Sequence, residues 1–357
     1  MRRPTPVTLV TVFAATHAVL LPLHAQSERK ITQLAQGVYE IQHRDANDGF
    51  AGGNTTVIIG TRQVLVVDTG FRPSEANEDI DQIRRWTDKP VSFVLNTHFH
   101  NDHNLGNRAY MKAFPAVTIV AQVETRKDMD RFGPGSRDRV ERGADRLRVM
   151  LAGGKRPDGT ALSDADKRAI SGSLEHRAGV IDELKDYSFQ GATLAFDDRL
   201  TIDLGDREVE LEFLGRGNTS GDAIAYLPKE KIAIVGDLVV SPLPYFYDGY
   251  PSEWARTLQR VSQLGASTIV PGHGPVMHDN AYIELVEALL DSAVTQMDRV
   301  LRATGPAMSR TLDDYKSQID LSSFRARFAK NDKDSEEAFD AMAADLVRLV
   351  YREAALR

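Results

Sequence analysis

The sequence contains no cysteine among its 357 residues. This absence excludes disulfide bonds, thiolate metal ligands and cysteine nucleophiles. A basic tract is also missing and the formal net charge is −7, so a nucleic-acid partner, which needs a basic face, is not expected. Because 42% of the residues are hydrophobic, the chain can bury a sizeable core. A metal site in this chain must use His, Asp, Glu or Asn side chains.

Long apolar runs are also scarce, and the one that stands out covers residues 7–23. It follows Arg2 and Arg3 and is succeeded by the small residue Ala25, which is the layout of a secretory signal. We expect residues 1–25 to be cleaved and the mature protein to be periplasmic or secreted, without a stable membrane anchor. The alternative is an uncleaved anchor, which a proline and several threonines within the run disfavour.

Short β-branched runs alternate with helical patterns, which predicts an α/β fold. Strands are expected in 31–43, in a hairpin over 54–70, at 91–97 and at 116–121. A helix is expected to begin at the N-cap Ser74. Further strands are expected at 199–215, 222–228, 231–237 and 267–274, with a helix between the last two.

Two segments differ from this pattern. Residues 124–186 are rich in Arg and Asp, with Gly/Pro breaks, and we interpret them as a helical insertion. Their charge run "SRDRVERGADRLR" is typical of a solvated helix face, although a lid over a site is also possible. From residue 280 onward the pattern is helical. We therefore predict a main domain over 26–300, containing the insertion, and a C-terminal helical extension over 301–357.

A third of the nine histidines fall in the stretch "NTHFHNDHNLG". His98 and His100 alternate along an extended segment, so both side chains can face one way. Asp102 and His103 follow where the loop turns. Neutral imidazole and carboxylate are the usual Zn²⁺ ligands when thiolates are absent, so this loop predicts a metal site with room for two ions.

Further ligands must come from elsewhere, because these residues cannot close a site alone. Asp237 ends the expected strand "IAIVGD", and His273 ends "STIVPGH". Strand ends that point the same way as the histidine-rich loop are where an α/β sheet places its site. Both residues are therefore candidate ligands.

The stretch "THFHNDH" resembles the His-x-His-x-Asp-His signature of the metallo-β-lactamase superfamily, and "VVDTG", "GRGNTSGD", "VGD" and "PGHG" follow the order of that family's motifs. The similarity spans about residues 31–278. It implies a four-layer αββα sandwich of two mixed β-sheets with helices on the outer faces. It also implies that one metal is held by Asp102, His103 and His273, and the other by His98 and His100, with Asp237 near or between both.

One position departs from the family. Where the family's "GHTxG" segment supplies a third histidine to the first metal, this chain has Asn218 in "GNTSG". An amide oxygen is a weaker zinc ligand than imidazole. We therefore expect one tightly bound Zn²⁺ and a second that is weak or substrate-dependent. The alternative is a binding protein whose first site has decayed.

Other residues have less decisive patterns. Asp68 in "VVDTG" is expected to fix the loop or orient a ligand, and Asp222 to be structural. The stretch "PLPYFYDGY" offers Tyr245, Phe246 and Tyr247 as an apolar wall for a substrate, or as ordinary packing.

These features together predict an exported zinc hydrolase that cleaves a small carbonyl substrate, such as a β-lactam, lactone or ester, by metal-bound hydroxide. Asp102 is expected to orient the attacking group as well as bind metal. Export disfavours a glutathione thioester as the substrate. A thioesterase of the glyoxalase II type is therefore kept only as an alternative. A non-hydrolytic metal-binding or partner-binding protein is another.

Overall fold

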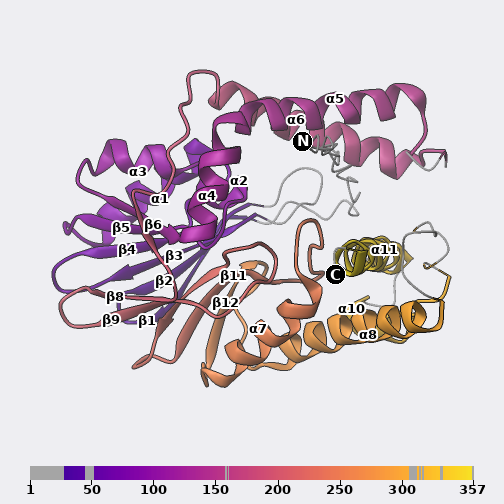
Figure 1. Ribbon diagram of the computed structural model, residues 1–357. Coiled ribbons are helices and arrows are strands. Elements are labelled where there is room, and N and C mark those ends of the chain that lie inside the picture. The colour runs from indigo at the N-terminus through magenta and orange to yellow at the C-terminus, as the bar shows by residue number, and fades with distance from the viewer. Residues whose placement is uncertain are drawn as a thin grey trace, which may run out of the picture.

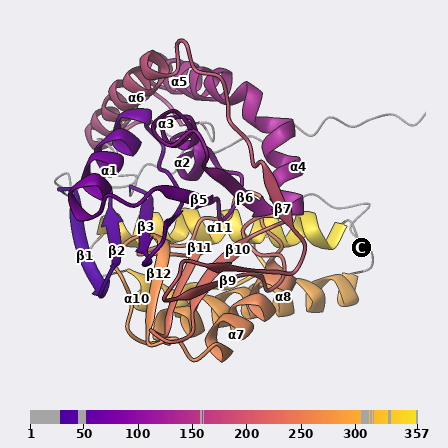
Figure 2. The same ribbon diagram turned by 90° about the vertical axis from the view of Figure 1, so that its left-hand side faces the viewer.

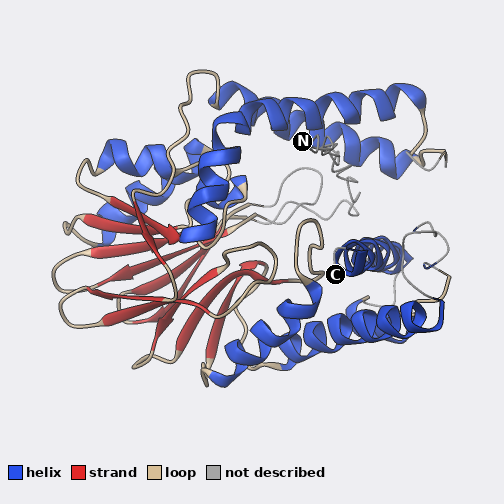
Figure 3. Ribbon diagram, viewed as in Figure 1, coloured by secondary structure: helices blue, strands red, loops and turns tan. Residues whose placement is uncertain are grey.

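The computed structural model of the protein is a sandwich of two mixed β-sheets with helices on both outer faces (Figure 1 and Figure 3). It describes residues 28–44, 52–156, 159, 161–304, 312, 315, 317–329 and 333–355. The expected signal segment lies outside these residues. The four layers are seen in Figure 2, where the sheets lie between two sets of helices. This architecture confirms the predicted αββα fold.

The first sheet has seven strands in sequence order, antiparallel from β1 to β4 and parallel from β4 to β7. The strands are β1 (Lys30–Ala35), β2 (Val38–Gln42), β3 (Asn54–Ile59), β4 (Val64–Val67), β5 (Val91–Leu95), β6 (Thr118–Gln122) and β7 (Leu194–Phe196). Every residue of β4 is buried, as expected for a strand covered on both faces.

The second sheet has the order β12-β11-β10-β9-β8, with β11 and β12 parallel and the other pairs antiparallel. The strands are β8 (Arg199–Asp203), β9 (Glu208–Phe213), β10 (Ala223–Leu227), β11 (Ile232–Val240) and β12 (Thr268–His273). Asp237 was predicted to end its strand, and this is wrong: β11 continues for three more residues. A register shift at Gly236, whose φ is +53°, lets the strand bend and continue.

Apolar side chains of both sheets interdigitate between them, including Val38, Leu65, Leu211 and Val270, each of which is fully buried. Burying one such side chain contributes about 1.5–3 kcal/mol. This inner layer sets the spacing of the sheets, and it therefore fixes where β5, β11 and β12 end relative to one another.

Helices α1 (Pro73–Trp86) and α3 (Asn107–Ala113) cover the first sheet, and α7 (Pro251–Gln263) and α8 (Ala281–Thr304) cover the second. The predicted N-cap Ser74 is wrong, because α1 begins one residue earlier at Pro73. Proline is favoured at the first helical position, and the Glu75 carboxylate accepts a hydrogen bond from the Arg72 backbone N–H at 3.3 Å.

The 124–186 segment contains most of α4 (Val123–Phe132), the short 3₁₀ turn η1 (Gly133–Gly135), α5 (Ser136–Gly153) and α6 (Asp164–Glu183). Helices α5 and α6 form a hairpin that extends beyond the sheets (Figure 1). A small apolar cluster around Leu147 and Ile170 joins the two helices. Surface ion pairs such as Arg148–Asp145 agree with the solvated helix face expected for this charge run.

The C-terminal helices are α10 (Ser322–Phe328) and α11 (Lys333–Ala355), which pack with α7 and α8 in one hydrophobic cluster. Phe339 and Leu346 of α11 are buried in it. Among the described helices, none combines the length and the apolar character needed to cross a membrane.

Candidate metal centre

The histidine-rich stretch follows β5 directly and then forms the single helical turn α2 (Asn101–Asn104). His98 and His103 are fully buried, whereas His100 and Asp102 are half-buried. Because α2 turns the chain back toward β5, the His103 carbonyl accepts hydrogen bonds from Thr69 N and from Asn96 Nδ2, both at 3.0 Å. This compact turn holds all four side chains at one edge of the sandwich.

In the described part of the chain, two groups of side chains have the spacing of a metal site. The first consists of His98, His100 and Asp237, whose ligand atoms all lie within 4.8 Å of one another. His98 Nε2 lies 2.9 Å from His100 Nδ1 and 3.5 Å from Asp237 Oδ2. The structure thus joins the loop after β5 with the middle of β11.

The second group consists of Asp102, His103 and His273. The Nε2 atoms of His103 and His273 lie 3.2 Å apart, and Asp102 Oδ2 lies 3.2 Å from His273 Nε2. Two nitrogen ligands of a tetrahedral Zn²⁺ are separated by about 3.3 Å, given Zn–N distances near 2.05 Å. The donor types and spacing of this group therefore fit a zinc ion.

Asp237 lies between the two groups. Its Oδ2 faces His98, and its Oδ1 lies 3.2 Å from His103 Nε2 and 3.5 Å from His273 Nε2. A side chain at Gly272 would collide with Asp237 Oδ1, so glycine is required there for the carboxylate to take this position. One carboxylate can thus serve both groups.

Asp68 contacts the centre through Thr97 and through the Nδ1 side of the His103 ring. Its Oδ1 accepts a hydrogen bond from Thr97 N, its Oδ2 accepts one from Thr97 Oγ1, and Oδ2 also lies 2.8 Å from His103 Nδ1. Thr97 Oγ1 in turn lies 3.0 Å from His98 Nδ1. Asp68 therefore orients one histidine of each group and leaves both Nε2 atoms directed at the centre, in agreement with the orienting role expected for it.

The charges of the centre favour a cation. Burial and the neighbouring imidazole of His103 hold the pKa of His98 well below its usual range. Burial also opposes the charged form of His103, but the carboxylates of Asp237, Asp68 and Asp102 outweigh it and raise the pKa of His103 well above its usual range. Three carboxylates around buried imidazoles therefore attract positive charge, which a divalent ion can supply in place of protons.

Asn218 lies in the loop between β9 and β10, whose ends are held near the centre. The Ala223 N–H donates to the Thr97 carbonyl at 2.8 Å, beside His98. Gly217 packs so closely on Leu238, beside Asp237, that a Cβ there would collide with it. Asn218 is buried, and both polar atoms of its side-chain amide lack a hydrogen-bond partner among the described residues.

Asp222 holds this loop in shape. Its carboxylate accepts hydrogen bonds from Thr219 N at 2.8 Å, from Thr219 Oγ1 at 2.9 Å and from Gly217 N at 3.1 Å. Burial, with a smaller effect from the charge of Asp237, raises the pKa of the Asp222 carboxyl to about 7. The structural role expected of Asp222 is thus the one observed.

The three aromatic residues that were expected near a substrate have different surroundings in the structure. The ring of Tyr245 lies 5.7 Å from that of His273, and Tyr247 follows it at 6.0 Å. Phe246 points into the core, where it is 2% exposed and packs edge-on against Trp254. Phe246 thus has the ordinary packing that was the alternative for this run, and the substrate wall stays a prediction for Tyr245 and Tyr247.

Two supporting residues have weak signals in the sequence. Thr97 links Asp68 to His98, and Asn54 Nδ2 donates to the carbonyls of Pro271 and Gly274, on either side of His273. An asparagine at the start of an apolar strand indicates that its buried amide has a hydrogen-bond partner, because buried polar groups are usually paired. The sequence does not show which residue that partner is.

Comparisons with known proteins agree with this arrangement. A family model described as "Metallo-beta-lactamase superfamily" matches residues 48–273. A linear primary-alkylsulfatase from Pseudomonas sp. (strain ATCC 19151) is 26% identical over 263 residues, which are 67% of this chain and 45% of that protein. A hydroxyacylglutathione hydrolase from Gloeobacter violaceus is 34% identical over 99 residues, which are 26% of this chain and 36% of that protein. The matched segments thus span less than half of these curated relatives.

Solved structures show the same fold. A metallo-beta-lactamase from Pontibacter korlensis superposes with a TM-score of 0.52 at 18% identity, covering 74% of this chain and 99% of that one. The DIM-1 metallo-beta-lactamase gives 0.51 at 17% identity, covering 75% and 100%. Since the family model covers more than half of the sequence, the chain belongs to the metallo-beta-lactamase superfamily.

Proposed function

We propose that the protein is an exported, zinc-dependent hydrolase that cleaves a small carbonyl substrate such as a β-lactam, a lactone or an ester. The observation that carries this proposal is the position of Asp237, whose two carboxylate oxygens face two separate groups of candidate ligands. Two adjacent cation positions that share a carboxylate suit hydrolysis. The hydrolytic character of the superfamily agrees with this chemistry.

The candidate residues have separate roles in metal binding and catalysis. Asp102, His103 and His273 hold the tightly bound zinc, and His98, His100 and Asp237 hold the weaker one, with Asn218 as a neutral additional ligand. Bound zinc polarises a carbonyl and lowers the pKa of water to about 7. Asp102 is the catalytic candidate, because its side chain is 18% exposed while those of the histidines beside it are fully buried. Its carboxylate can orient an attacking water toward the substrate.

A sulfate ester is a second candidate substrate. It is favoured by the relative named as a linear primary-alkylsulfatase, whose similarity extends over 67% of this chain. The thioesterase alternative is favoured by the shorter match to a hydroxyacylglutathione hydrolase. A non-hydrolytic binding protein is the remaining alternative, and it requires that Asn218 has disabled the first group.

The test combines metal analysis with a substrate panel. Purified mature protein is analysed for zinc and then assayed with chromogenic β-lactam, lactone, ester, thioester and alkyl sulfate substrates, beside the Asp102→Asn variant. We expect zinc-dependent turnover of at least one class, lost in the variant. Zinc-loaded wild-type protein that hydrolyses none of these classes would contradict the proposal and favour a binding role.

A further inference from the structure

The insertion contacts the loop that carries four of the candidate ligands. Asn101 lies between His100 and Asp102 in the chain and is half-buried. Its side-chain oxygen accepts hydrogen bonds from Ser136 Oγ at 2.9 Å and from Arg139 Nη2 at 3.0 Å. Ser136 is the first residue of α5 and is buried. Two donors from the insertion thus meet on one amide oxygen within the metal-binding loop.

Arg139 is itself held by two further contacts. Its Nη1 donates to the Phe132 carbonyl, and its Nη2 donates to Ser136 Oγ at 3.0 Å. Phe132 is the last residue of α4, where the carbonyls have no partner within the helix. A planar guanidinium group presents its donors in a fixed fork, so it can bind this carbonyl and the Asn101 amide together. Arg139 therefore joins the end of α4 to the metal-binding loop.

Ring contacts support the same junction. The ring of Phe99 lies 4.7 Å from that of His100 and 5.4 Å from that of Phe132. Gly133 follows Phe132 and packs so closely on Phe189 that a Cβ there would lie 2.1 Å from the ring. The bend between α4 and α5 is thus fixed by packing as well as by hydrogen bonds.

Helix α4 also contacts the loop that carries Asn218. Thr125 Oγ1 donates to the Gly221 carbonyl, and Ser220 Oγ donates to Asp128 Oδ2, both at 2.7 Å. A Cβ at Gly221 would lie 2.6 Å from Thr125 N, so this loop lies directly against the start of α4. The insertion therefore contacts both loops that carry candidate ligands of the first group.

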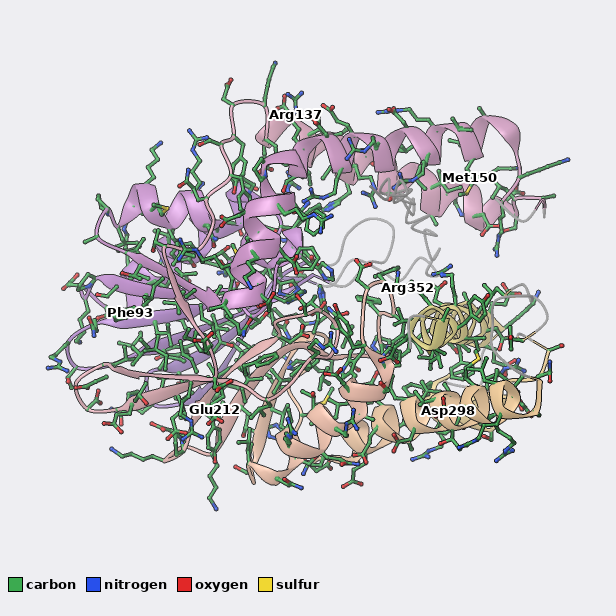
Figure 4. All side chains as sticks on the ribbon, viewed as in Figure 1. Phe93, Arg137, Met150, Glu212, Asp298 and Arg352 are labelled. Atoms are coloured by element: carbon green, nitrogen blue, oxygen red, sulfur yellow. The ribbon has the colours of Figure 1, made fainter. Side chains whose placement is uncertain are left out.

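These contacts come from one end of the insertion. In Figure 4, Arg137 marks the end of α5 that lies nearer the sheets, and Met150 lies farther out along the hairpin. The outer part has its own apolar cluster around Leu147 and Ile170. Substitutions there can therefore serve as controls for substitutions at the junction.

We propose that the insertion positions the metal ligands, with Arg139 and Ser136 as positioning residues that hold the Asn101 side chain. Because Asn101 is next to both His100 and Asp102, holding it restrains one ligand of each group. A metal site needs its ligands within about 0.5 Å of the working geometry, and supporting hydrogen bonds supply that restraint. This inference rests on the proposed metal centre and gives the insertion a role other than that of a lid.

The test uses the purified full chain titrated with Co²⁺, whose visible absorption reports ligand geometry without a substrate. Arg139→Met keeps the length of the side chain and removes its donors. It should weaken Co²⁺ binding about tenfold and change the spectrum, because losing a support behind metal ligands usually costs at least that factor. The control is Arg148→Met, at an exposed arginine of the same helix that pairs with Asp145, and it should match the wild type.

Ser136→Ala is the milder variant, since it removes one hydroxyl, and it should shift Co²⁺ affinity in the same direction. It decides the matter if thermal melting shows that Arg139→Met does not fold. Unchanged affinity and spectrum in Ser136→Ala and in folded Arg139→Met would overturn the positioning role.

A double-mutant cycle separates positioning from a general effect on folding. If Arg139 acts through the Asn101 amide, Arg139→Met should weaken Co²⁺ binding much less in an Asn101→Ala background than in the wild type. Its effect on thermal melting should persist there, because the contact with the Phe132 carbonyl is lost in either background. An equal loss of affinity in both backgrounds would overturn the inference. Wild-type protein that binds no Co²⁺ would contradict the proposed metal centre, and the inference with it.

Discussion

Asp68 Oδ2 lies 2.8 Å from His103 Nδ1, and this contact directs His103 Nε2 at the candidate centre. Asp68 has a positive φ of 60°, a conformation that asparagine and aspartate tolerate better than other side chains. The strained backbone of the turn after β4 is therefore used to place one carboxylate between Thr97 and His103.

Replacing Asp68 with asparagine tests this orientation without changing shape. Asp68→Asn should lower zinc affinity by roughly 10- to 100-fold, the usual cost of losing a carboxylate behind a ligating histidine. The measurement is competition with a chromophoric chelator, and Asp203→Asn, at an exposed surface pair with Arg62, is the control. Equal affinity in wild type and Asp68→Asn would show that the contact does not orient a ligand.

The two ligand groups can be separated by deletion. His103→Ala and His273→Ala should each remove the tightly held zinc, because each takes one ligand from the group of Asp102, His103 and His273, to which Asp237 Oδ1 adds a further oxygen. His98→Ala should leave about one zinc per chain after dialysis. Elemental analysis decides the matter: full zinc content in both His103→Ala and His273→Ala would make the assignment wrong.

Much of this centre can be predicted from the sequence because its loop is local. His98, His100, Asp102 and His103 lie within six positions of the chain, and Asp237 and His273 are candidates because both are expected at strand ends. The family resemblance adds which metal each residue would hold. The bend at Gly236 was not predictable, since a glycine inside an apolar strand pattern does not reveal a register shift. Likewise, "SEANED" offers a good N-cap at Ser74, but the fixed φ of Pro73 starts the helix first.

The surroundings of the centre were harder to predict because they depend on contacts between distant segments. Asn54 and His273 belong to separate parts of the chain, and no spacing rule connects the Asn54 amide with the Pro271 and Gly274 carbonyls that accept its hydrogen bonds. Phe246 shows a related limit, because the ring of the neighbouring Tyr245 lies 5.7 Å from that of His273 while Phe246 packs on Trp254. Which residues of a short aromatic run turn inward is decided by tertiary packing.

Export is tested on the protein from its native host. The basic start, the apolar run and Ala25 predict a mature chain that begins near residue 26. Intact-mass spectrometry of fractionated cells measures this directly. A soluble cytoplasmic form that retains Met1 would refute the signal.

His43 is expected to make the free energy of unfolding depend on pH, at a position away from the candidate metal centre. Its Nε2 lies 3.2 Å from Asp79 Oδ2 in the core beneath α1. Burial opposes its charge, but Asp79 outweighs burial and raises the pKa of His43. A pKa raised in the folded state means that protonated His43 stabilises the fold. This contribution is fully present below about pH 6.5, the unfolded value, and is lost as pH rises through the folded value.

His43→Gln should therefore lower the stability near pH 6 by about 1.5–3 kcal/mol, the usual contribution of a hydrogen bond to a charged group, because it removes the imidazolium beside Asp79 Oδ2. Arg29 Nη2, 2.7 Å from Asp79 Oδ1, still pairs with the carboxylate in the variant. The difference from wild type should shrink as the pH rises above about 6.5 and through the raised folded pKa of His43. Urea denaturation across this range measures both effects, and His278→Gln, at a histidine outside this cluster, is the control. A difference that stays constant with pH would show that His43 is neutral in the folded protein.

Asn218 provides the sharpest test of the metal assignment. A buried amide with no partner costs about 1–3 kcal/mol for each unsatisfied group, so a ligand at the centre would explain why both of its polar atoms are unpaired among the described residues. Because an amide oxygen is a weaker ligand than imidazole, wild-type protein should retain close to one zinc per chain after dialysis against a weak chelator.

Asn218→His should supply the missing imidazole and move the stoichiometry toward two, while Asn218→Ala should leave it near one. Cobalt substitution gives a readout that does not depend on turnover, since a second bound Co²⁺ adds to the visible absorption. The loop is held by Asp222 rather than by Asn218, so neither variant should unfold it, and thermal melting checks this. Wild-type protein that holds two zinc ions as tightly as Asn218→His would mean that another residue completes the first group.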